Sequence, residues 1–276
     1  MNETRSQTLL LALGMLCTLG FVLGPFAYML LVSLCQSEAL LRPEPTLHFT
    51  LAHYRTVLTT ESLHFLAYVR NSLIVSALSA LLSVWVAALA AYAITRLPLP
   101  GTTLVLLGTL AVSLFPPVSL VSYLFTWMAA AGWINTYQAL IFPYVAWTLP
   151  LSLWVLVSYF AQVPRELDRA ALLDGCSRWQ VLRHIVLPVA MPGLVSTALL
   201  AFIFAFNELL FALMLSTDYH ASTIPVALAR FEGQHGQLPW GEIMAAAVLT
   251  TVPVVVLVLR FQGRIIQGLT RGAVKA

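Results

Sequence analysis

The longest stretch without charge most constrains what this chain can fold into. Positions 97 to 164, a run of 68 residues, contain no Asp, Glu, Lys or Arg. A helix needs about 20 apolar residues to cross the hydrocarbon core of a bilayer. The run therefore predicts a hairpin of two membrane helices that turns at Gly132–Tyr137. Charged residues make up 9% of the chain, against about 25% in soluble domains, so a soluble fold is excluded.

Apolar segments between polar connections predict six membrane-spanning helices and an all-α fold. The first segment is too long for the core of a secretory signal, which has about 7–15 residues, and we expect it to be retained. The whole chain, residues 1–276, is expected to form one transmembrane domain with a cytosolic loop at 161–192. The predicted spans are Leu9–Leu34, Ser72–Ile94, Thr103–Met128, Gln138–Phe160, Gly193–Leu215 and Glu242–Arg260.

The distribution of Lys and Arg orients the predicted spans, because cytoplasmic loops carry an excess of these residues. With the N-terminus in the cytoplasm, ten of the 14 lie inside and four outside. Both termini are then cytoplasmic, and so is the charged loop 161–192. The three cysteines give no disulfide framework. The net charge of +3 is small, and it gives no indication of nucleic-acid binding.

Prolines interrupt two of the predicted spans. Pro116 and Pro117 lie in the middle of the third span, and Pro143 and Pro150 lie in the fourth. Proline removes a helical hydrogen bond, and the freed carbonyl must be satisfied by protein or by water in a cavity. Two interpretations are open: a kink absorbed by packing, or a broken helix that borders a translocation path.

A polar pair, Asn207 and Glu208, lies within the fifth predicted span. A charge at the centre of a membrane helix costs about 2.5–3.5 kcal/mol on insertion scales. Such a pair is expected to face the interior of the bundle or a cavity. It either belongs to the translocation path or forms hydrogen bonds with neighbouring helices.

The first half of the cytosolic loop reads as a short helix. Pro164 suits its first turn, and Glu166 and Asp168 favour its positive end. Gly175 is expected to end the helix in a backbone conformation that only glycine adopts cheaply. One face of this helix would suit the close approach of a partner. That face contains Leu167, Ala170, Ala171 and Asp174.

The second half of the loop reads as another helix. Ser177 and Gln180 have the spacing of a capping box, and Pro188 is expected to stop the helix. The two helices form an elbow shaped to dock in the groove of a partner. Its apolar residues are Trp179, Leu182, Ile185 and Val186.

The elbow resembles the EAA loop of binding-protein-dependent ABC importers, which has two alanines, an Asp-Gly pair and a later Ile-x-Leu-Pro. One position departs from the motif, because Arg169 stands where the family has glutamate; Glu166 and Asp168 are acidic nearby. The matching residues are Ala170, Ala171, Asp174, Gly175, Ile185, Leu187 and Pro188.

The resemblance extends to carbohydrate permeases of the maltose-transporter class. Phe202–Leu210 is similar to their fifth span, and Gly268–Ala276 is similar to their Gly-rich tail. Phe115–Leu120 is most similar to permeases for trehalose-like disaccharides and glucosides. The resemblance implies one permease subunit of a sugar importer in a bacterial cytoplasmic membrane.

The resemblance also implies a set of partners. A second permease would share the translocation path, and an extracytoplasmic sugar-binding protein would contact the outer loop Ser216–Gly241. A homodimer of ATPase subunits would bind ATP and Mg²⁺, with no cofactor in this chain. The residues implied to couple to the ATPase are Glu166, Asp168, Ala170, Ala171, Asp174, Gly175, Ile185, Leu187 and Pro188.

Two other classes of function compete with this interpretation. An intramembrane enzyme is disfavoured because the chain has no His-Glu-x-x-His motif and no histidine within a predicted span; no metal site is expected. A secondary transporter or channel would leave the cytosolic elbow without a role. The chain has no P-loop, because its single lysine, Lys275, is followed by Ala276 rather than Ser or Thr.

Overall fold

The computed structural model describes residues 2–35, 49–231 and 239–273. Most of these residues are helical, and the part of the chain described contains no β-strand beyond an isolated bridge between Cys35 and Phe49. The all-α fold is therefore confirmed. The chain forms two compact units, Met1–Leu66 with Ala227–Pro253, and Ala67–Val226 with Val254–Ala276.

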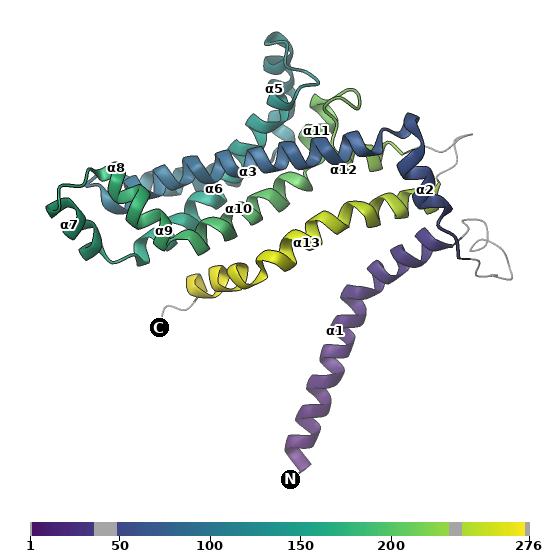
Figure 1. The fold of residues 1–276 in the computed structure, drawn as a ribbon, viewed down its shortest axis with the longest axis horizontal. Coiled ribbons are helices and arrows are strands. Elements are labelled where there is room, and N and C mark those ends of the chain that lie inside the picture. The colour runs from purple at the N-terminus through teal and green to yellow at the C-terminus, as the bar shows by residue number, and fades with distance from the viewer. Residues whose placement is uncertain (1, 36–48, 232–238, 274–276) are drawn as a thin grey trace. The chain divides into compact units, whose positions relative to one another are not determined.

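The first unit contains α1 (Asn2–Leu34), α2 (Ala52–Thr59) and the start of α13 (Trp240–Ala273) (Figure 1). His53 of α2 joins them. Its Nε2 lies 3.1 Å from the carbonyl oxygen of Cys35, after the end of α1. Its Nδ1 lies 3.2 Å from the Glu242 carboxylate in α13. The apolar side chains of α1 are exposed along most of its length, as expected of a helix that faces lipid or another subunit.

The first unit also contains a short 3-10 helix, Glu61–Leu63, and the second unit holds the rest of α13 and the other helices. Of these, α3 begins in the first unit and α12 ends in it. The α6 and α10 helices pack together where Gly193 of α10 meets the ring of Tyr159, which would lie only 2.3 Å from an added Cβ. The elements are α3 (Phe65–Arg96), α4 (Thr102–Ser113), α5 (Val118–Ala130), α6 (Tyr137–Gln162), α7 (Arg165–Leu173), α8 (Arg178–Val181), a π turn (Leu182–Val186), α9 (Leu187–Val189), α10 (Met191–Phe206), α11 (Leu210–Leu215) and α12 (Ile224–Ala229).

Small residues line the buried face of α3. Close helix contacts in membranes depend on such residues, since lipid supplies no hydrophobic driving force between helices. One of the serines, Ser83, lies 3.1 Å from the hydroxyl of Ser152 in α6. The buried small residues are Ser72, Ser76, Ser79, Ala80, Ser83, Ala87, Ala88 and Ala91.

Among the residues described, four helices are long and apolar enough to cross a membrane, and the number is up to six if each of two bent pairs forms one span. This agrees with the six predicted spans. The continuous spans are Leu10–Leu34, Glu61–Arg96, Tyr137–Gln162 and Trp240–Gly263. The bent pairs are Thr102–Ser113 with Val118–Ala130, at 93°, and Arg178–Val189 with Met191–Phe206, at 78°.

The structure decides between the two interpretations of the prolines, and it differs from the prediction in the fifth span. The third is broken between α4 and α5, where Pro116 and Pro117 lie. The fourth continues through Pro143 and Pro150 as the single helix α6, so these prolines do not break it. The predicted fifth span is interrupted at residues 207–209, where α10 ends and α11 has not begun.

Candidate functional site

A glycine turn joins the two halves of the elbow. Gly175 has a φ of +85°, in the left-handed region that glycine enters without a Cβ penalty. Its N–H donates to the carbonyl of Leu172 at 3.2 Å, and the Cys176 N–H donates to that of Ala171 at 2.9 Å. This is the Schellman pattern, which satisfies the last carbonyls of a helix. The predicted role of Gly175 in ending the helix is confirmed.

The second half of the elbow begins with the predicted capping box. The Gln180 N–H donates to the Ser177 hydroxyl at 3.3 Å, and the Ser177 N–H donates to Gln180 Oε1 at 2.6 Å. The predicted stop at Pro188 is wrong, because the helical path continues to Val189. A π turn precedes the proline, in which the Leu187 N–H donates to the carbonyl of Leu182. The chain bends after Val189, at Ala190.

The predicted partner face of α7 is wrong at Ala171, which is turned inward. Ala171 is buried in a core formed with Tyr92, Val181 and other residues of α3, α6 and α8. Asp168, predicted to couple to the ATPase subunit, is also largely buried. Its carboxylate pairs with Arg96 Nε at 2.9 Å. The spacing of three between Asp168 and Ala171 therefore marks the inner face of α7.

The outward face of α7 lies on the opposite side. Glu166, Ala170 and Leu173 follow at spacings of four and three, which places them on one helical stripe, and Arg169 lies beside them. All four residues are exposed, Leu173 to 89%. An apolar side chain so exposed at the tip of the elbow suits a contact surface.

The remaining predicted coupling residues divide between surface and core. Asp174, Gly175 and Pro188 are exposed. Ile185 and Leu187 are half-buried and pack against the same core as Ala171. The structure thus divides the predicted coupling set into residues that a partner can reach and residues that fix the elbow to its own chain.

The polar pair in the fifth span bonds to its own backbone. Both carboxylate oxygens of Glu208 accept from the Phe211 N–H, at 3.0 and 3.1 Å, and one accepts from the Ala212 N–H at 3.2 Å. Glu208 thereby satisfies the first free N–H groups of α11, a position where a helix favours negative charge. The Asn207 amide donates to the carbonyl of Ile203 at 2.8 Å.

The two pairs of residues predicted to border the translocation path lie at different helix interruptions. Pro116 and Pro117 lie between α4 and α5, and Asn207 and Glu208 lie between α10 and α11; α11 packs against α5 and α6. A cavity of about 290 Å³ lies near these elements and is lined by neither pair. Its lining is mainly apolar and aromatic. The lining residues are Val112, Leu120, Tyr123, Leu124, Trp127, Pro143, Ala146, Trp147 and Phe211.

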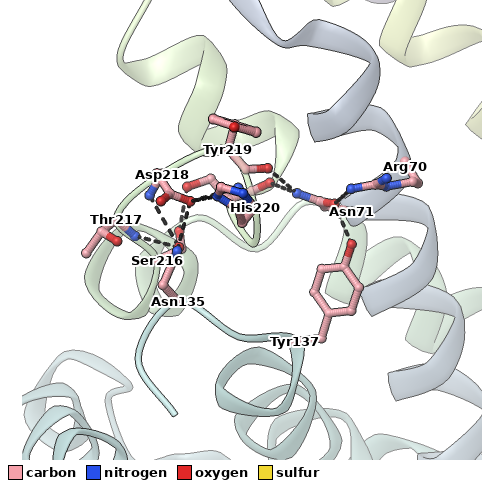
Figure 2. Close-up of polar contacts among 10 residues, drawn as sticks. Arg70, Asn71, Asn135, Tyr137, Ser216, Thr217, Asp218, Tyr219 and His220 are labelled. Carbon is pink, nitrogen blue, oxygen red and sulfur yellow. Dashed lines mark hydrogen bonds and ion pairs between the residues drawn. The ribbon is translucent and has the colours of Figure 1, made fainter. Parts of the chain in front are cut away.

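Sequence reasoning missed a polar network (Figure 2), which lies at the end of the second unit opposite the elbow (Figure 1). Asn71, fully buried at the start of α3, is its centre. Its amide nitrogen donates to the carbonyls of Tyr219 and Ser222, at 2.8 and 3.0 Å. Its amide oxygen accepts from the Tyr137 hydroxyl at 2.6 Å. The sequence signal that could have indicated this network is an asparagine directly before a long, mainly apolar segment.

Asn135, in the turn between α5 and α6, holds the same segment from another side (Figure 2). Its φ is +62°, a region that asparagine tolerates. Its amide oxygen accepts from the N–H groups of Thr217 and Asp218, at 3.1 and 3.3 Å. Its amide nitrogen donates to the Asp218 carboxylate at 2.8 Å. Asn71 and Asn135 together fix residues 216–222, which we call the outer platform because the loop Ser216–Gly241 is predicted to face the outside.

The outer platform presents polar groups to solvent. The hydrogen bond from Asn135 and that from the His220 backbone lower the pKa of the Asp218 carboxyl below its usual value. The His220 ring lies 2.9 Å from this carboxylate and stacks on Tyr219, with 4.2 Å between ring centroids. Asp218, Tyr219 and His220 are exposed, so this end of the unit offers an acidic and aromatic surface in a fixed geometry.

Solved structures support the fold. The chain matches the crystal structure of a bacterial ABC transporter involved in the import of the acidic polysaccharide alginate, with a TM-score of 0.80. The match covers 95% of this chain and 98% of that chain, at 17% identity. A second match has a TM-score of 0.61 and 17% identity, and covers 94% of each chain. It is the bacterial alginate ABC transporter in complex with an alginate pentasaccharide-bound periplasmic protein.

Sequence comparison shows the family. The trehalose/maltose transport system permease protein MalG of Thermococcus litoralis is 48% identical over 276 residues, 100% of this chain and 99% of that protein. The trehalose transport system permease protein SugB of Mycobacterium tuberculosis is 43% identical over 206 residues, 74% of this chain and 75% of that protein. A family model matches residues 72–271. The chain therefore belongs to the binding-protein-dependent transport system inner membrane component family, the permease subunits of ABC importers.

Proposed function

We propose that this permease carries a disaccharide of the trehalose and maltose kind. The observation that carries the proposal is the 48% identity, over the whole chain, to the trehalose/maltose permease of Thermococcus litoralis. The Mycobacterium tuberculosis relative, at 43% identity, is a trehalose permease. The two relatives share trehalose, which is therefore the first sugar to test.

The permease works with three partners in this proposal. A second permease completes the translocation path, two copies of an ATPase subunit bind ATP and Mg²⁺, and an extracytoplasmic protein delivers the sugar. The complex of the similar alginate importer with its periplasmic protein supports the third partner. Pro116, Pro117, Asn207 and Glu208 are proposed to border the path at the two breaks described above.

The ATPase subunit docks, in this proposal, on the outward face of α7. Leu173 is the central apolar contact, and Glu166, Arg169 and Ala170 surround it. Asp174, Gly175 and Pro188 form the adjoining exposed edge. Arg169 stands where the family motif has an acidic residue, so we expect an acidic or neutral group opposite it on the ATPase subunit.

Orientation follows from the same proposal. The elbow and the outer platform lie at opposite ends of the second unit (Figure 1). With the elbow and both termini in the cytoplasm, the outer platform faces the sugar-binding protein. The excess of Lys and Arg on the elbow side supports this orientation. The expected contact loop, Ser216–Gly241, includes residues 232–238, which lie outside the described residues.

Sugar uptake in a deletion strain tests the proposed substrate. Uptake of radiolabelled trehalose and maltose is expected to disappear with the gene and to return with it. Leu173→Asp is expected to abolish the restored uptake and the co-purification of the ATPase subunit. Leu99→Asp is the matched control, since Leu99 is an exposed leucine in the turn before α4 and lies outside the proposed face. Normal uptake with Leu173→Asp would refute the docking face, and unchanged uptake in the deletion strain would refute the substrate.

A further inference from the structure

A single arginine at the cytosolic end of α3 joins three elements. Arg96 is the last residue of α3, and its side chain is 3% exposed. Its Nε pairs with Asp168 of α7 at 2.9 Å. Its Nη2 donates to the carbonyls of Phe160 and Val163, at 3.0 and 2.6 Å, where α6 ends. The guanidinium therefore connects α3, the end of α6 and α7 at once.

Arginine suits this position better than lysine. The last carbonyls of a helix have no partner within it, and those at the end of α6 accept from the same side chain that pairs with Asp168. Arginine has five donors in a rigid fork, whereas the lysine ammonium is a compact point charge. The junction thus uses the fork geometry as well as the charge.

Two further hydrogen bonds connect the end of α3 to the elbow. Arg165 Nη2, at the start of α7, donates to the carbonyl of Thr95 at 3.1 Å. The Tyr92 hydroxyl donates to the carbonyl of Arg178, at the start of α8, at 3.2 Å. Both halves of the elbow are therefore attached to the last two turns of α3.

We propose that the Arg96–Asp168 ion pair is the joint through which movement of the elbow reaches the membrane helices. The proposal rests on the proposed function above. Asp168 is then a positioning residue inside the chain and makes no contact with the ATPase subunit. A shift of α7 relative to α3 and α6 would separate a buried charge pair, which is strongly unfavourable because each charge is left without its partner. The three helices consequently move together when the ATPase subunit displaces α7.

The joint and the docking face are on opposite sides of α7. Asp168 points inward, while Glu166, Ala170 and Leu173 point outward. Removal of the ion pair should leave the ATPase subunit docked but disconnect its movement from the spans. This separates the joint from a docking residue, whose loss abolishes binding itself.

The test uses the assembled complex of both permeases, the ATPase subunits and the sugar-binding protein in proteoliposomes. Asp168→Asn keeps the shape of the side chain and removes its charge, and Asp168→Glu keeps the charge. For Asp168→Asn we expect ATPase co-purification within about twofold of the parent chain and sugar transported per ATP hydrolysed reduced at least about tenfold. Asp168→Glu should recover part of this ratio. Arg96→Gln should resemble Asp168→Asn, and Arg183→Gln, an exposed arginine of the elbow, is the matched control.

A second measurement does not depend on the sugar. Thr217→Cys places a thiol on the exposed outer platform, in a chain whose native Cys17, Cys35 and Cys176 are replaced by serine. We expect ATP with vanadate to change its labelling rate by a membrane-impermeant maleimide, and Asp168→Asn to abolish that change while docking persists. Loss of docking in Asp168→Asn, or an unchanged labelling response, would overturn the proposal. Absence of disaccharide uptake in the parent complex would count only against the proposed substrate, since the labelling comparison would still decide the joint.

Discussion

The turn at Gly175 allows backbone strain to be measured without steric conflict. A Cβ built at Gly175 meets nothing within 4 Å. The cost of a side chain there is therefore torsional, and the left-handed conformation costs an L-residue roughly 1–2 kcal/mol. That energy reduces the population of the native turn about 5–30-fold relative to conformations in which residue 175 does not adopt the left-handed backbone. We expect uptake and ATPase co-purification to fall in the order Gly175→Asn, Gly175→Ala, Gly175→Val, because asparagine tolerates this region and β-branched residues do not.

Gly132 is a matched control within the same chain. Its φ is +69°, a Cβ there also meets nothing within 4 Å, and it ends α5 with the same pair of hydrogen bonds, Gly132 to Ala129 and Trp133 to Met128. Gly132→Ala should lower thermal stability as much as Gly175→Ala and leave ATPase co-purification unchanged. Equal loss of co-purification with Gly175→Asn and Gly175→Val would refute the torsional explanation, because side-chain volume rather than φ would then decide the effect.

Three further outcomes follow from the described contacts. Ala171→Trp should destabilise the permease itself by about 1–3 kcal/mol, since Ala171 is in its own core, and a lower melting temperature of the isolated subunit measures this. Asn71→Ala should cost about 1–3 kcal/mol by leaving buried polar groups unpaired and should speed proteolysis at the outer platform. The lowered pKa of Asp218 means that its contribution to the platform is complete above the usual carboxyl pKa of about 4 and is lost as pH falls through the lower folded value. Proteolysis of the platform should therefore accelerate only at strongly acidic pH, and Asp218→Asn should remove that pH dependence.

Local signals in the sequence predicted the elbow correctly where the contacts are local. The capping box of Ser177 and Gln180 and the turn at Gly175 depend on residues within a few positions of each other, and both are present. The face of α7 depends on Arg96, 72 positions before Asp168, which draws that carboxylate inward. Helical spacing predicts which residues share a face of a helix, but not whether that face points to the core or to a partner. Ala171 was therefore predicted on the partner face, although it lies in the core.

The prolines show the same limit within the membrane. Pro116 and Pro117 are adjacent, so two N–H groups are lost together and the first proline is itself disfavoured in the α conformation by the second; the span breaks there. Pro143 and Pro150 stand alone, and α6 continues through both. Asn71 and Asn135 escaped notice because their partners, residues 216–222, are distant in sequence and become neighbours only in the folded unit.

The small residues on α3 have a consequence for how freely that helix can shift along its axis. Helices with large interlocking side chains resist axial displacement, because each side chain must leave one gap and enter the next. Between Ser72 and Ala91, eight of the buried positions on α3 are serine or alanine and two are valine, Val75 and Val84. Most of the groups that a displacement of one turn, about 5.4 Å, would exchange are therefore small, and the packing energy varies less along the axis than it would with large side chains throughout. The resting position of α3 then depends strongly on its polar contacts: those of Asn71 near its start and of Arg96 at its end, which lie about 38 Å apart along the helix, and the contact of Ser83 with Ser152 between them.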